Sequence, residues 1–252
     1  MENKYLKCFF FTIAIFFWLI VFDGVRYALD PMNENHVYMI IFRIVNGVFL
    51  LVLVYFRKRP IAKVCLFLLS FKKRNFQFLW KYFILICLLF CLITFLGYFS
   101  DINHLQANAS WTYQGLGLGF ILALSIAFEE EIAFRGLIAV YFKRYLGENH
   151  AILLSAISFA LIHINYTSFL PFITVFLAGI LFAFLMFRCK SIYPALGIHA
   201  GWDFCYYIFD KYFVPDKIPF WGEPFEFFQI ALMIVLIMLT FKWVKYRKKA
   251  VV

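Results

Sequence analysis

The sequence has no polar stretch long enough to fold as a separate soluble domain, and charged residues make up only 15% of its 252 positions. Hydrophobic residues account for 65% and aromatic residues for 23%, values that lie far outside the range of soluble domains. This composition excludes a soluble globular protein. It predicts an integral membrane protein organised as one membrane domain over residues 1–252.

Several familiar motifs are also missing. The six cysteines contain no CxxC pair, which argues against a zinc knuckle or a disulfide framework. We find no internal repeat, no HExxH zinc motif and no context for a dinucleotide-binding loop. The closely spaced Gly115, Gly117 and Gly119 are instead expected to permit close packing between membrane helices.

Apolar runs of about 20 residues, the length that crosses a bilayer as a helix, recur along the chain. We expect eight transmembrane helices, near residues 8–27, 37–56, 76–98, 116–142, 150–165, 169–187, 192–209 and 225–244. Residues 61–70 are too short to cross and are expected to lie along the inner interface. The predicted fold class is therefore all-α, a polytopic bundle of about eight membrane helices.

Lysine and arginine outnumber aspartate and glutamate by 24 to 14, and they are unevenly placed. Under an eight-span count, almost all of them outside the spans fall on one side, and only Arg26, Lys211 and Lys217 fall on the other. The positive-inside rule then predicts that both termini are cytoplasmic. The excess of basic residues is therefore explained by the orientation of the chain in the lipid bilayer. A nucleic-acid partner is not needed to explain it.

The span 116–142 contains four ionisable residues that are costly inside a membrane: Glu129, Glu130, Glu131 and Arg135. Each charge near the bilayer centre costs about 2.5 to 3.5 kcal/mol on the lenient insertion scale. Glu131 and Arg135 can pair on one helix face, but Glu130 points about 100° away from Glu131. At least one glutamate therefore needs a partner from another helix. Arg43 and Asn46, in the span 37–56, are expected only to supply packing polarity.

Polar residues at helical spacing recur in two other spans. Phe159 and His163 lie one turn apart in the fifth span, and His199 and Asp203 lie one turn apart in the seventh. At about 1.5 Å per residue from the cytoplasmic helix ends, Glu130, His163 and Asp203 all lie roughly 20 Å into the membrane. We expect these groups to converge on one buried polar cavity, with a purely structural ion cluster as the alternative.

These residues form three motifs in order along the chain. They read Glu130-Glu131-Ile-Ala-Phe-Arg135, Phe159-Ala-Leu-Ile-His163 and His199-Ala-Gly-Trp-Asp203. They resemble the EExxxR, FxxxH and HxxxN or HxxxD motifs of the CPBP intramembrane proteases, which include the CAAX prenyl endopeptidases and bacterial proteins linked to bacteriocin self-immunity. The resemblance covers a catalytic core of about residues 116–209 and implies peptidase activity in an eight-span bundle.

The resemblance also implies a role for each residue. Glu130 and His163 would activate a water molecule, since a carboxylate removed from water is a better base near neutral pH. His199 would stabilise the oxyanion, and Asp203, which replaces the commoner Asn, would hold His199 in orientation. The residues expected to support the base are Glu131, Arg135 and Phe159.

Other functions stay open from the sequence. Two histidines and two carboxylates suffice for zinc, so a zinc-dependent protease with Glu130, His163, His199 and Asp203 as ligands is the alternative to our expectation of no cofactor. Buried Glu and His could also relay protons in a transporter, or the fold could act as a non-catalytic immunity or scaffold protein. The expected substrate is a membrane-associated peptide or protein, prenylated or not, at the bacterial cytoplasmic membrane. The oligomeric state is left open.

Overall fold

The computed structural model describes residues 3–30, 36–57, 64, 67–99, 105–107, 112–163, 169–215 and 223–249. The described chain is almost entirely helical, as expected. Its α-helices are α1 (Lys4–Leu29), α2 (His36–Arg57), α4 (Lys73–Phe99), α5 (Tyr113–Glu131), α6 (Val140–Leu146), α7 (Glu148–Leu161), α8 (Phe169–Cys189), α9 (Tyr193–Tyr212) and α10 (Glu223–Lys249). Half of the stretch 61–70, predicted to lie at the interface, falls outside the described residues.

The expected spans fall on these helices. By length and apolar composition alone, four helices in the described part of the chain could cross a membrane: α1, α4, α8 and most of α2. The chain is therefore a multi-pass membrane protein. Helices α5 and α9, which carry the costly polar side chains, are not among the four, and the number eight stays a prediction.

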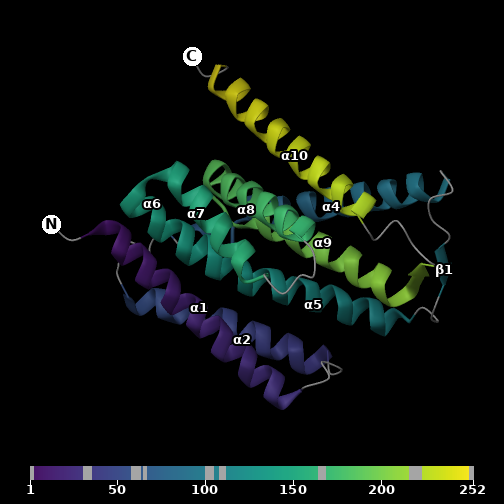
Figure 1. The fold of residues 1–252 in the computed structure, drawn as a ribbon, viewed down its shortest axis with the longest axis horizontal. Helices are drawn as coiled ribbons and strands as arrows, with labels where there is room; N and C mark the ends of the chain where they lie inside the picture. The colour runs from purple at the N-terminus through teal and green to yellow at the C-terminus, as the bar shows by residue number, and fades with distance from the viewer. Residues whose placement is uncertain are drawn as a thin grey trace.

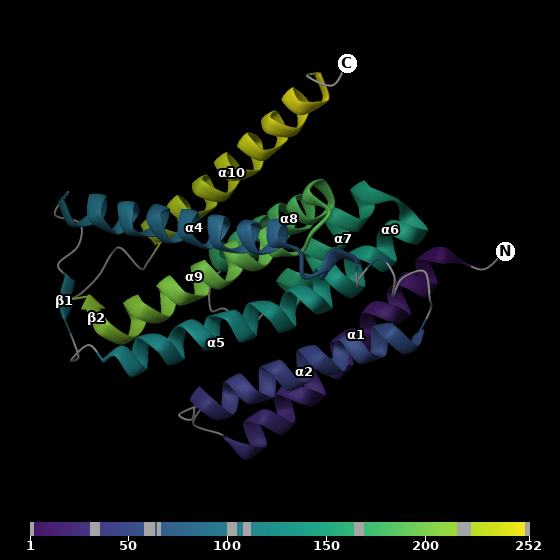
Figure 2. The ribbon, with the colours of Figure 1, turned by 180° about the vertical axis from the view of Figure 1, so that it is seen from behind.

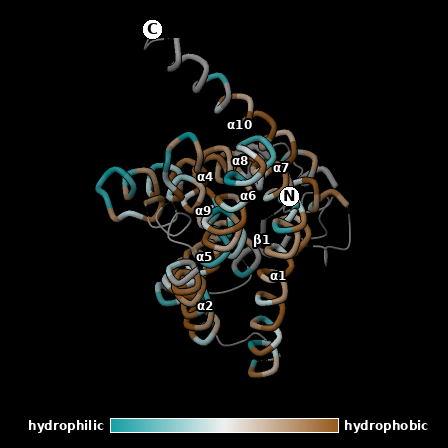
Figure 3. Tube along the Cα trace, turned by 90° about the vertical axis from the view of Figure 1, so that its left-hand side faces the viewer, coloured by the Kyte–Doolittle hydropathy of each residue, from teal (hydrophilic) through white to brown (hydrophobic). Residues whose placement is uncertain are grey.

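The central helix α5 contacts α2 on one side and α9 on the other, while α4 packs along α9 and α10 packs against α8. Helices α1 and α2 lie side by side along one flank, and α10 leaves the opposite flank (Figures 1 and 2). Hydrophobic residues predominate along α1 and α2 (Figure 3), and many of their large apolar side chains are exposed. A hydrophobic outer surface of this kind fits contact with lipid.

Basic residues gather at one end of the bundle. The start of α1, the junction of α6 and α7 and the end of α10 lie at one end, with β1 and β2 at the other (Figures 1 and 2). At that first end, α1 begins at Lys4, α6 carries Lys143 and Arg144 in its last turn, and α8 carries Arg188 in its last turn. The helix directions therefore agree with the alternation of basic loops in the sequence.

Two local features were not predicted. The span 116–142, expected as one regular helix, is α5 followed by a π-helix, η1 (Ile132–Ala139), and then by α6. A π-helix shifts the hydrogen bonds to i→i+5 and occurs frequently at functional sites, and η1 contains the motif residue Arg135. The second feature is a short antiparallel pair of strands, β1 (Leu105–Ala107) and β2 (Phe213–Pro215).

Glycines allow helix α9 to approach α4 closely. A Cβ atom built on Gly197 would overlap the carbonyl oxygen of Leu79, and one on Gly201 would lie 3.0 Å from the carbonyl oxygen of Phe83. In lipid, van der Waals packing of this kind replaces the hydrophobic effect as the main attraction between helices. The close contact fixes α9, the helix that carries His199 and Asp203.

Candidate active site

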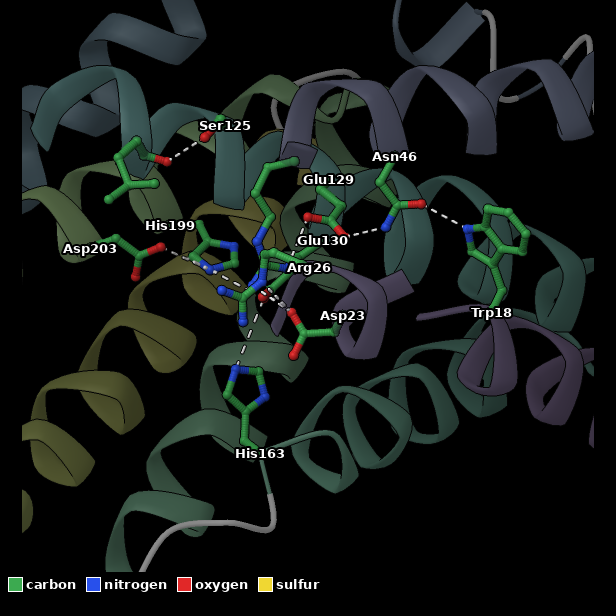
Figure 4. Close-up of polar contacts among 12 residues, drawn as sticks. Trp18, Asp23, Arg26, Asn46, Ser125, Glu129, Glu130, His163, His199 and Asp203 are labelled. Atoms are coloured by element: carbon green, nitrogen blue, oxygen red, sulfur yellow. Dashed lines mark hydrogen bonds and ion pairs between the residues drawn. The ribbon is translucent and has the colours of Figure 1, made fainter. Parts of the chain in front are cut away.

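A cavity of about 320 Å³ lies between α5 and α9. Its polar lining is Glu130, His163, His199 and Asp203, and the rest of its wall is formed by Gly119, Leu122, Ala123, Ile126, Tyr206 and Tyr207. The structure thus brings together all four residues expected to be catalytic, which come from α5, from the turn after α7 and from α9 (Figure 4).

Glu130 lies at the centre of this group. Its Oε2 atom is 3.6 Å from Nε2 of His199 and 4.0 Å from Nε2 of His163. The residue is only 9% exposed, and within the described part of the chain this oxygen accepts no hydrogen bond from a side chain or the backbone. A buried carboxylate oxygen in such a position is suited to bind a water molecule or a substrate group.

The orientation of His163 is set by the residue one turn earlier. Its Nδ1 atom lies 2.9 Å from the carbonyl oxygen of Phe159. Because a carbonyl oxygen can only accept, Nδ1 carries the hydrogen, and Nε2 is an acceptor in the neutral ring. The Phe159 carbonyl is available because it lies in the last turn of α7, where carbonyls lack intrahelical donors. The FxxxH spacing therefore presents an acceptor nitrogen to Glu130.

His199 is held through its other nitrogen. Nδ1 of His199 lies 3.0 Å from Oε1 of Glu131, and Nη1 of Arg135 lies 3.1 Å from the same oxygen. Oδ2 of Asp203 is 3.5 Å from Nε2 of His199. The expected pairing of Glu131 with Arg135 is present. The sequence did not reveal the contact of Glu131 with the His199 ring, which is shorter than that of Asp203. The orienting role of Asp203 stays a prediction.

Aromatic rings enclose these charges. The guanidinium carbon of Arg135 lies 4.2 Å from the ring centre of Phe159 and 4.9 Å from that of Phe182. The ring of Phe182 also stacks on His199 at 5.3 Å, with an interplanar angle of 23°. Contacts of this kind stabilise a desolvated cation. Phe182 belongs to α8 and was not predicted, because one more Phe in an apolar helix gives no sequence signal.

A comparison with protein families concerns the same part of the chain. The sequence model of the type II CAAX prenyl endopeptidase Rce1-like family matches residues 108–205, a range that contains all three motifs. This match supports assignment to the CPBP/CAAX protease family. That family consists of intramembrane proteases, so the match indicates a membrane-embedded hydrolase. No curated protein and no solved structure matches the chain.

Glu129, the glutamate outside the family motif, has partners of its own. Arg43 donates to its Oε2 from Nη1 at 2.9 Å, and Asn46 donates to its Oε1 from Nδ2. Asn46 in turn accepts from Nε1 of Trp18 at 2.7 Å (Figure 4). Arg43 and Asn46 do supply polar contacts between helices, as predicted. The sequence did not show that their partner is the residue beside Glu130.

The side chains around the cavity also bear on the question of a zinc site. In the residues that the structure describes, no group of three or more His, Cys, Asp or Glu side chains is arranged to hold a metal ion. The Nδ1 atoms of His163 and His199 face Phe159 and Glu131, so only their Nε2 atoms face Glu130. A metal at this site would have to use these two Nε2 atoms together with the Glu130 carboxylate.

Proposed function

We propose that the chain is an intramembrane endopeptidase in which Glu130 and His163 activate the attacking water and His199 stabilises the oxyanion. The observation that carries the proposal is the placement of both imidazoles within 4.0 Å of one buried carboxylate, on the wall of one cavity. Ionisable groups at membrane depth cost several kcal/mol. Their convergence in a cavity therefore favours a chemical role over a structural one.

In the first step, a water molecule binds between two hydrogen-bond acceptors that face each other. Oε2 of Glu130 and Nε2 of His163 are 4.0 Å apart, so a water molecule at about 2.8 Å from each can donate one hydrogen to each. Its lone pair is then free to attack the carbonyl carbon of a peptide bond. As the new C–O bond forms, Glu130 takes a proton from the water, and it delivers that proton to the nitrogen when the C–N bond breaks.

The second role concerns the charge that develops on the carbonyl oxygen. With Nδ1 of His199 directed at Glu131, Nε2 can donate a hydrogen bond only from the doubly protonated ring. Glu131 and Asp203, at 3.0 and 3.5 Å, supply the counter-charges for that form. A donor fixed in this way before the reaction, away from bulk water, is effective in stabilising an oxyanion.

The remaining wall of the cavity indicates the kind of substrate. Leu122, Ala123 and Ile126 line it from α5, and Tyr206 and Tyr207 line it from α9. We propose that an apolar segment of a membrane-associated peptide or protein occupies this part. A prenylated tail, as named in the description of the matching family, is one member of that class. We further propose that the enzyme crosses the bacterial cytoplasmic membrane eight times, with its basic end and both termini in the cytoplasm.

Replacement of Glu130 tests the proposal. Cleavage of a farnesylated, internally quenched peptide, with an aliphatic tripeptide after the lipidated cysteine, should vanish in Glu130→Gln while the Tm of the purified protein is kept. Glu148→Gln is the matched control, because Glu148 forms its ion pairs with Lys143 at 2.7 Å and Arg188 at 3.5 Å, at the junction of α6 and α7.

A comparison of the membrane peptidome of cells with the wild type and Glu130→Gln covers substrates other than the probe. Peptides that persist only in the variant are expected. Cleavage or peptidome changes that survive Glu130→Gln would rule out this glutamate as the base. If the protein were a non-catalytic scaffold, cells with the wild type and cells with Glu130→Gln would show the same phenotype.

A further inference from the structure

The carboxylate of Glu129 is held on both of its oxygens by donors from helix α2. Arg43 reaches Oε2 and Asn46 reaches Oε1. Glu129 is 2% exposed and Asn46 is 1% exposed, so these contacts are shielded from solvent. A buried carboxylate that is paired and hydrogen-bonded in this way has its orientation fixed, because any rotation leaves a charge without a partner.

Helix α1 supports these donors. The indole nitrogen of Trp18 can only donate, so its 2.7 Å contact fixes the amide oxygen of Asn46 toward α1 and the amide nitrogen toward Glu129. Asp23 lies 3.7 Å from Nη2 of Arg43, so Arg43 stands between two carboxylates. The three helices α1, α2 and α5 are therefore joined by one polar network next to the cavity (Figure 4).

The network holds α5 at Glu129, the residue next to Glu130. Glu129 and Glu130 are consecutive, so their side chains leave the helix about 100° apart, one toward α2 and the other into the cavity. The backbones are also close there, since a Cβ atom built on Gly47 of α2 would lie 3.5 Å from Cα of Glu129. A side chain ends about 5 to 6 Å from the helix axis, so a rotation of roughly 10° would move the carboxylate of Glu130 by about 1 Å.

We propose that Glu129, Arg43 and Asn46 are positioning residues of the protease, which hold α5 in the rotation that directs Glu130 at His163 and His199. The inference rests on the proposed role of Glu130 as the base. It gives Glu129, the first of the three consecutive glutamates, a function that the family motif does not include. A displacement of about 1 Å at a reacting group lowers turnover by about 100-fold, so this anchor has a kinetic consequence.

Steady-state cleavage of the farnesylated quenched peptide by Glu129→Gln and Arg43→Gln tests the kinetic part. We expect kcat to fall by about 10- to 100-fold, because the base leaves its reactive position. KM should change less, because the part of the wall formed by Tyr206 and Tyr207 belongs to α9 and stays in place. The double variant Arg43→Gln/Glu129→Gln can form an amide pair and should be no worse than either single variant. Glu148→Gln is again the matched control.

A measurement that needs no substrate separates this inference from the proposed function. In protein labelled with ¹⁵N-histidine, the ring nitrogen resonances of His163 and His199 should shift in Glu129→Gln. The resonances of His150, in the first turn of α7, should not shift. If Glu129→Gln does not fold, Asn46→Ala can be used instead, because it removes only a neutral donor. It should shift the same resonances by a smaller amount.

The outcomes can be told apart. Site resonances that stay at their wild-type positions overturn the inference, whatever the cleavage assay shows. If the resonances shift but Glu130→Gln still cleaves, the anchor positions Glu130 and the proposed role of Glu130 as base fails. A kcat loss that tracks a fall in Tm, without a change in the resonances, would reduce Glu129 to a structural residue.

Discussion

Glu131 of α5 and His199 of α9 lie within hydrogen-bond distance of each other, 3.0 Å apart, although 68 positions separate them in the sequence. The same oxygen of Glu131 lies 3.1 Å from Nη1 of Arg135, which is fully buried. One carboxylate therefore compensates a buried guanidinium and orients the histidine proposed to stabilise the oxyanion. The second glutamate of the EExxxR motif thus connects the stability of the fold to the geometry of the site.

Removing the charge of Glu131 should destabilise the protein. In Glu131→Gln the guanidinium of Arg135 keeps its charge inside the protein without its partner, at a cost of about 3–5 kcal/mol. The double variant Glu131→Gln/Arg135→Met removes both charges and should recover much of the Tm in detergent. A double variant that unfolds at the same temperature as Glu131→Gln, or below it, would contradict this explanation.

His199 and Asp203 should differ in their importance for turnover. His199→Ala removes the proposed oxyanion donor and should lower kcat by about 100- to 1,000-fold. Asp203→Asn keeps an oxygen near His199 and adds a donor, so we expect about a tenfold loss or less. The measurement is steady-state cleavage of the same lipidated peptide. Losses of equal size would mean that Asp203 acts in the reaction as directly as His199.

The metal requirement can be decided on purified protein. Incubation with a zinc chelator should leave cleavage of the lipidated peptide unchanged, and later addition of zinc should not stimulate it. Elemental analysis of the purified chain should find zinc well below one atom per molecule. Activity that is lost with the chelator and restored by zinc would favour a metal centre formed by Glu130, His163, His199 and Asp203.

Close packing of α9 on α4 gives a test of the scaffold. A methyl group at Gly201 would overlap the side chain of Ile86 and lie 3.0 Å from the carbonyl oxygen of Phe83, so Gly201→Ala should cost about 1–3 kcal/mol. It should also lower turnover, because it displaces the helix that carries His199.

Gly117→Ala is the control for that substitution. No described atom outside the local helix lies within 4 Å of a Cβ at Gly117. Because Ala is the better helix former by about 0.8–1.0 kcal/mol, this variant should keep its Tm or gain stability. Equal destabilisation by the two substitutions would show that helix contact is not the cause.

The sequence by itself determined the membrane character, the approximate helices and the four polar residues that line the cavity. These features follow from local properties: the length of apolar runs, the cost of charge in lipid and the spacing of motif residues. The depth of each polar group could also be estimated, because the rise per residue of a helix is constant. Glu130, His163, His199 and Asp203 were found in this way.

Only the tertiary structure decided which side chains meet. The contact of His199 with Glu131, the stacking of Phe182 and the attachment of Glu129 to α2 all depend on the rotation of each helix about its own axis. In a soluble protein an apolar stripe would indicate that rotation, but membrane helices that are hydrophobic on most sides carry no such stripe. The π-helix was hidden for a similar reason, since its altered hydrogen bonds leave no mark on an apolar sequence.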